Sequence, residues 1–78
     1  MIMTEKYNKL VAIYKEMQSA IREAYDIVLD YADRLDYDKG KKAKAQELRD
    51  SARVSYELDR EEINNKFQES KDRLFNID

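Results

Sequence analysis

The stretch that decides the fold is YNKLVAIYKEMQSAIREAYDIVLDYADRL, residues 7–35. Along it, apolar and aromatic residues recur at alternating steps of three and four. This spacing is typical of a helix that packs lengthwise against another helix, as in a coiled coil. The predicted seam consists of Tyr7, Leu10, Tyr14, Met17, Ile21, Ala24, Val28, Tyr31 and Leu35.

Composition agrees with long helices and excludes several other classes. The chain has 78 residues, no proline, one glycine and 41% charged residues, which predicts one all-α domain spanning residues 1–78. At this size a hydrophobic core alone is barely sufficient for stability. Cysteine and histidine are absent, so disulfides and the common zinc and haem ligands are excluded. We therefore expect no metal site and no cofactor, and we expect association between chains to supply the missing stability.

The single glycine, Gly40, divides the chain. Glycine adopts the left-handed conformation that ends a helix at little steric cost. We predict one helix over about residues 4–37, a turn at about 38–41 and a second helix over about 41–76, which form an antiparallel two-helix hairpin. Folding the chain back at Gly40 pairs positions whose numbers add to about 80. That register places Tyr14 near Phe67, and it sets two apolar residues, Leu10 and Ile21, opposite polar ones.

The apolar face of the first helix is too broad for one neighbouring helix. Beside the seam it carries Val11, Ile13, Tyr25 and Ile27, which are the predicted partner-binding residues. A face of this width indicates more than one packing partner. The simplest arrangement is a homodimer in which two hairpins form a four-helix bundle. The alternatives are a different protein on the same face, and a monomer that leaves the face exposed.

A cluster of lysines at the turn raises a second possibility. It consists of Lys39, Lys41, Lys42 and Lys44. Lysines grouped in this way can neutralise phosphates and so bind nucleic acid in a salt-dependent manner. The chain carries a net charge of −2, however, and four aspartates lie nearby at Asp30, Asp33, Asp36 and Asp38. We therefore expect the turn to be largely paired internally, with nucleic-acid binding as the alternative function.

Six tyrosines are a further feature of the composition. Tyrosine rings can stack on bases, but most of these residues occupy seam positions, which predicts packing with the hydroxyl at the rim. Asp59 is one candidate acceptor for such a hydroxyl. Nothing in the sequence indicates catalysis: general acid–base chemistry near neutral pH is easiest with histidine, and a glycine-rich phosphate loop is absent. We expect a protein that is not an enzyme.

One short motif resembles a known family. Ser55, Leu58 and Asp59 match the Ser-x-x-Leu-Asp signature of small helical-hairpin phosphatases that act on aspartyl-phosphate response regulators of sporulating bacteria. The resemblance covers three residues and implies regulator dephosphorylation as a further alternative. The predicted helices are longer than those of that family, and the apolar spacing after Asp59 departs from its pattern. In architecture alone, the hairpin also resembles the plasmid-encoded dimeric hairpin that binds RNA loops, a likeness that carries no function.

Targeting signals are not recognisable in the sequence. The N-terminus lacks the basic segment and apolar run of a signal peptide, and no stretch approaches the roughly 20 apolar residues of a membrane span. We therefore expect a cytoplasmic protein without membrane association. Frequent Lys, Asn, Ile and Tyr residues suggest a low-GC bacterium or a phage as the source. The expected function is regulation through protein binding and self-association.

Overall fold

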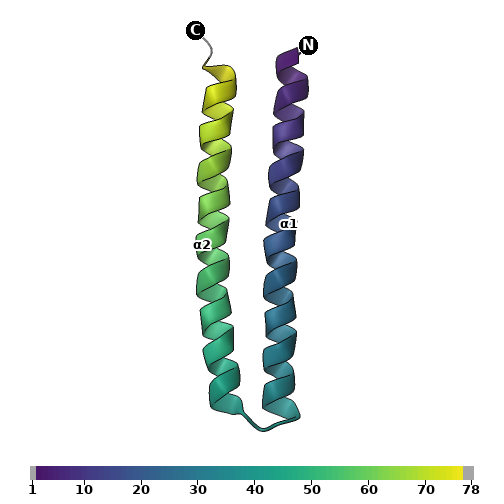
Figure 1. Cartoon of the computed structure of the whole chain (residues 1–78), viewed down its shortest axis with the longest axis vertical. Coiled ribbons are helices and arrows are strands. Elements are labelled where there is room, and N and C mark those ends of the chain that lie inside the picture. Colours follow the sequence, from purple (N-terminus) through teal and green to yellow (C-terminus); the bar gives the residue numbers. More distant parts are fainter. Residues whose placement is uncertain (1, 77–78) are drawn as a thin grey trace.

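The chain forms two antiparallel helices joined by a short turn (Figure 1). The structure, a computed structural model, describes residues 2–76. Helix α1 spans Ile2–Tyr37 and helix α2 spans Lys42–Phe75. The Cα atoms extend over 60 × 17 × 6 Å, so the hairpin is long, narrow and one helix layer thick. The predicted all-α antiparallel hairpin is confirmed, and strands are absent from the part of the chain described.

Gly40 ends α1 as the sequence predicts. Its φ angle is +65°, which lies in the left-handed region. This conformation turns the next amides back toward the helix: the N–H of Gly40 donates to the carbonyl of Asp36 at 3.1 Å, and the N–H of Lys41 donates to that of Leu35 at 2.9 Å. Carbonyls that a helix end would leave without partners are thereby satisfied.

Substituting Gly40 tests the turn. A Cβ at this position would meet no atom within 4 Å, so only the backbone conformation opposes a side chain. We expect Gly40→Ala to lower the free energy of unfolding by about 1 kcal/mol, because alanine is strained at positive φ. Gly40→Asn is the matched control and should lose less, since asparagine tolerates this region. Urea denaturation followed by circular dichroism measures both, and equal stability of all three proteins would contradict the assignment.

Aromatic contacts fix the register of the two helices. The rings of Tyr14 and Phe67 meet edge to face with centroids 5.4 Å apart, as the predicted register requires. The ring centroids of Tyr7 and Phe75 lie 5.5 Å apart at the open end of the hairpin. Offset and edge-to-face ring pairs are favourable beyond the area that they bury. The pairing of heights along the hairpin therefore follows the sequence prediction.

The rotation of α1 differs from the prediction. The side of α1 that packs on α2 is an inner stripe whose members are all buried or half-buried: Tyr7, Val11, Tyr14, Gln18, Ile21, Tyr25, Val28, Ala32 and Leu35. The predicted seam was wrong at Met17, Ala24 and Tyr31, which are exposed. In each case the next residue along the chain takes the inner position.

The reason for this rotation lies in what α2 offers. Tyr56 on α2 stacks on Tyr25, with ring centroids 4.9 Å apart and planes inclined by 13°. Near the turn, Ala32 and Ala45 have no exposed surface, so these small residues let the helices approach closely. A heptad pattern read on one helix does not contain this information, because it depends on the partner.

The core of the hairpin is very small. Among the described residues only Ala32, Ala45 and Ile63 are buried, and no large side chain is fully buried. Two helices without a third layer enclose few side chains, since each helix touches only one neighbour. The hairpin therefore leaves much apolar surface in contact with water.

Candidate functional site

An exposed apolar stripe runs along α1 beside the surface that packs on α2. This outer stripe consists of Leu10, Ile13, Met17, Ala20, Ala24, Ile27 and Tyr31. Its members are apolar or aromatic, and they recur at alternating steps of three and four residues. α1 therefore carries two adjacent stripes with the spacing of a helix-packing seam, and only the inner stripe packs on α2. Leu10 is half-buried and the other six are exposed.

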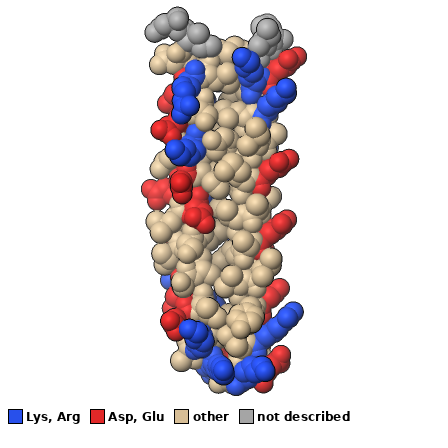
Figure 2. Space-filling model, in the orientation of Figure 1, with Lys and Arg blue, Asp and Glu red and all other residues tan. Residues whose placement is uncertain are grey.

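The exposure of the outer stripe is unusual in extent. Ile27 is 69% exposed, Tyr31 57% and Ile13 53%. Single exposed apolar residues are common on proteins, but a continuous apolar patch marks an association surface. On the face of the hairpin that Figure 2 shows, uncharged side chains form a long band, and charged groups gather at its edges and ends.

A groove follows the stripe where α1 meets α2. One section, of about 280 Å³, has Ile21, Ala24 and Val28 on its α1 side and Leu48, Ser51 and Ser55 on its α2 side. A second section, of about 230 Å³, continues it toward the open end between Met17 and Glu62. Ile21 and Asp59 line both sections, so they form one shallow groove. Its apolar lining adds to the surface of the outer stripe.

Polar contacts also join the two helices. The Gln18 amide donates to the Asn64 side chain at 3.1 Å, and the Tyr14 and Ser70 hydroxyls lie 3.3 Å apart. The Tyr14 hydroxyl thus pairs with Ser70, a partner that the sequence analysis did not name. The guanidinium of Arg22 covers the Tyr25–Tyr56 stack, 5.6 Å from the first ring centroid and 5.7 Å from the second. Gln18, Tyr14 and Arg22 on α1 each contact a residue of α2, so these contacts depend on how the two helices pack.

The four predicted partner-binding residues divide between the two stripes. Ile13 and Ile27 lie on the outer stripe and face water. Val11 and Tyr25 lie on the inner stripe, half-buried against α2. Partner binding by these four residues stays a prediction, and of the four only Ile13 and Ile27 have exposed side chains.

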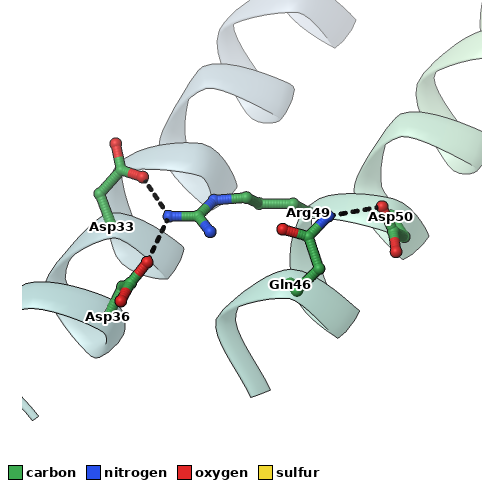
Figure 3. A network of polar contacts seen from close by, with 5 residues as sticks. All are labelled: Asp33, Asp36, Gln46, Arg49 and Asp50. Carbon is green, nitrogen blue, oxygen red and sulfur yellow. Dashed lines mark hydrogen bonds and ion pairs between the residues drawn. The ribbon is translucent and has the colours of Figure 1, made fainter. Parts of the chain in front are cut away.

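The turn end is held by an arginine that the sequence analysis did not single out. Arg49 on α2 reaches across to α1, where its Nη2 lies 2.6 Å from Asp33 Oδ1 and 3.4 Å from Asp36 Oδ2 (Figure 3). The hydrogen bond to Asp33 raises the pKa of Arg49 further above its ordinary value, so this guanidinium stays charged. Two of the four aspartates expected beside the lysines are therefore engaged by Arg49.

The lysines of the turn lie at the surface. Lys39, Lys41, Lys42 and Lys44 are all exposed. Lys44 pairs with Glu47 at 3.5 Å, and among residues 3–76 no ion pair within 4.0 Å involves the other three. Figure 2 shows basic groups gathered at this end of the molecule. Internal pairing of the turn thus rests on Arg49 and Lys44 instead of on the whole lysine cluster.

The short phosphatase-like motif lies at and beside the groove. Ser55 and Asp59 line its first section, and both are exposed. Leu58 is 61% exposed on α2. Asp59, opposite Ile21 in the predicted register, avoids an enclosed position because the groove is open to water, which spares it the cost of burying a charge.

No group of three or more acidic side chains in residues 2–76 is arranged to hold a metal ion. Neither helix, over the range described, combines the length and apolar character needed to cross a membrane. Comparison with protein-family models, with curated proteins and with solved structures found no match.

Proposed function

We propose that this chain is a non-enzymatic interaction protein, a helical hairpin that self-associates and acts by binding proteins through the exposed face of α1. One observation carries this proposal: six of the seven side chains of the outer stripe are exposed to water, while the core of the described residues contains one large residue, Ile63. A continuous seam of this kind is costly to leave exposed, because apolar surface gains about 25 cal/mol per Å² on burial.

The free energy available from burying the outer stripe supports association. Burying a large apolar side chain completely contributes roughly 1.5–3 kcal/mol. Ile13, Ile27 and Tyr31 are each more than half exposed, so each retains a substantial part of this gain. Two copies that cover one another bury both stripes. Their combined gain then opposes the loss of translational and rotational freedom, which is on the order of 4–15 kcal/mol.

A double substitution on the outer stripe tests the proposal. We expect Ile13→Glu with Ile27→Glu to keep the helicity of the chain and to reduce a dimer to the 9.3 kDa monomer. The dissociation constant should rise about 100-fold or more, since burying an unpaired carboxylate costs several kcal/mol and each 1.4 kcal/mol is tenfold. Sedimentation at micromolar concentration measures the mass, and circular dichroism the helicity.

The matched control is Val54→Glu. Val54 is 51% exposed, close to the 53% of Ile13, but it lies on α2 outside the groove. It should leave the mass of the particle unchanged. An unmodified chain that is monomeric at these concentrations would contradict self-association, and a double variant that keeps the dimer mass would remove the outer stripe from the interface.

Binding of nucleic acid by the turn stays a prediction. The exposed Lys39, Lys41 and Lys42 are the groups that would contact phosphates. Titration with RNA and DNA at two salt concentrations, using the chain and a Lys41→Glu, Lys42→Glu variant, measures this directly. Phosphate contacts require that affinity fall as salt rises. Salt-independent binding, or equal binding by the variant, would exclude the lysine cluster.

A further inference from the structure

The spacing of the outer stripe indicates what kind of surface covers it. From Leu10 to Tyr31 the steps alternate between three and four residues without interruption. A strict alternation over this length matches the seam that a helix presents to another helix lying nearly along it. An irregular surface or a strand does not require such regularity. The occupant is therefore a long helix with an apolar seam of the same period.

The order of side-chain sizes along the stripe points to a second copy of α1 in reverse direction. Large residues stand toward both ends and small ones at the centre, where Ala20 and Ala24 lie. Reversing the stripe about Ala20 sets Leu10 of one copy beside Tyr31 of the other and Ile13 beside Ile27. Met17 then lies over Ala24, so a long side chain fills the space beside a small one, as close packing requires.

The parallel arrangement packs this stripe less well. In it each residue meets its own copy, so Ala20 meets Ala20 and Ala24 meets Ala24 in adjacent layers. Two adjacent layers of alanine leave a gap in the seam, and voids cost packing energy. The charged residues beside the outer stripe do not decide between the two arrangements. Reversing the stripe brings Lys9 near Asp30, which have opposite charges, but it also brings Glu16 near Glu23, which have the same charge. The apolar sizes favour the antiparallel pair.

The available area is sufficient for a stable dimer. The Cα atoms of the hairpin spread over a face of 60 × 17 Å. This face, with both helices included, has a projected area of about 1,000 Å². An interface of standard size, in which each partner buries about 800 Å², therefore extends from the outer stripe across the groove onto α2. A two-fold axis uses the same face on both chains and ends growth at two copies.

We infer that α1 packs antiparallel against α1 of a second copy, with the two-fold axis passing beside Ala20. This arrangement presupposes the self-association proposed above and adds its direction and register. The outer stripes of the two chains form the seam, and the grooves beside Ile21 and Asp59 lie at its margin.

Single cysteines test the register cleanly because the chain has no cysteine of its own. On the two-fold axis, Ala20→Cys comes beside its own copy, whereas in antiparallel helices two copies of residue 10 are separated by roughly 30 Å. We expect Ala20→Cys to form about tenfold more covalent dimer under mild oxidation than Leu10→Cys or Tyr31→Cys alone, since a disulfide needs Cα atoms within about 7 Å. Mixing Leu10→Cys with Tyr31→Cys should restore cross-linking.

The outcomes separate this inference from the proposed function. Sedimentation of each reduced variant first establishes whether it is dimeric. A dimer in which Leu10→Cys and Tyr31→Cys each cross-link to themselves is parallel, and it overturns the register while self-association stands. A dimer in which Ala20→Cys fails to cross-link, with Met17→Cys and Ala24→Cys failing when mixed, also overturns the inference. A monomer contradicts both proposals.

Discussion

Ile63→Ala is expected to lower the free energy of unfolding by about 3 kcal/mol, within the range for deleting a buried aliphatic side chain. Ile63 is 7% exposed and is the one large residue in the buried set of the described chain. It lies beside Met17 and Ile21 on the floor of the groove, where the hairpin has no third layer of its own to move in and fill the space. A cavity at this position therefore loses contacts without compensation.

Val54→Ala is the control for this substitution. It removes methyl groups from a side chain that is 51% exposed, so we expect a change of less than about 0.5 kcal/mol. Both variants and the parent chain are unfolded in urea at one protein concentration, because the stability of an associating protein depends on concentration. If Ile63→Ala and Val54→Ala lose the same small amount, the core does not lie where the structure places it.

The hairpin itself could be predicted from few residues. Gly40 is the single position able to end a helix without strain, and its φ of +65° confirms this role. The repeated spacing before Gly40, and the absence of proline or a second glycine after it, then predict two helices of similar length that pack against each other. Turn chemistry and periodicity are local properties of the chain, which is why the sequence alone determines them.

The rotation of α1 could not be predicted in the same way. Ile21 and its heptad equivalents belong to two possible seams, one with Ala24 and one with Tyr25. Both seams are regular, so periodicity cannot choose between them. The choice depends on Tyr56 of α2, which stacks on Tyr25, and this is a contact between residues far apart in the sequence. Tertiary packing selects between two patterns that are locally equivalent.

The candidate site could likewise be predicted only in part from the sequence. The sequence predicts a broad apolar face on the first helix, and Ile13 and Ile27 are exposed in the structure. Val11 and Tyr25 were grouped with them because they flank the predicted seam, and the rotation of the helix turns both toward α2. Arg49 was missed because lysines dominate the turn in number. Its signal was its position one turn beyond Ala45, on the side of α2 that faces α1.

Ala32→Leu tests the close approach of the helices near the turn. Ala32 has no exposed surface, and neither has Ala45 on α2. A leucine there must push the helices apart, so we expect a loss of about 2 kcal/mol in the free energy of unfolding. Ala12→Leu is the matched control on the same helix, because Ala12 is exposed.

Helix propensity cannot cause the expected difference, since both substitutions exchange alanine for leucine inside α1. The position relative to α2 is what distinguishes them.

Separation of the helices at Ala32 also strains the contact of Arg49 with Asp33, which is 2.6 Å long in the parent chain. Comparing the free energy of unfolding in 0.1 M and 1 M salt tests that ion pair, because salt weakens exposed charge interactions. We expect salt to lower the stability of the Ala12→Leu protein more than that of the Ala32→Leu protein. If Ala32→Leu lowers the free energy of unfolding no more than Ala12→Leu, α1 has a different rotation about its axis, with Tyr31 on the inner stripe.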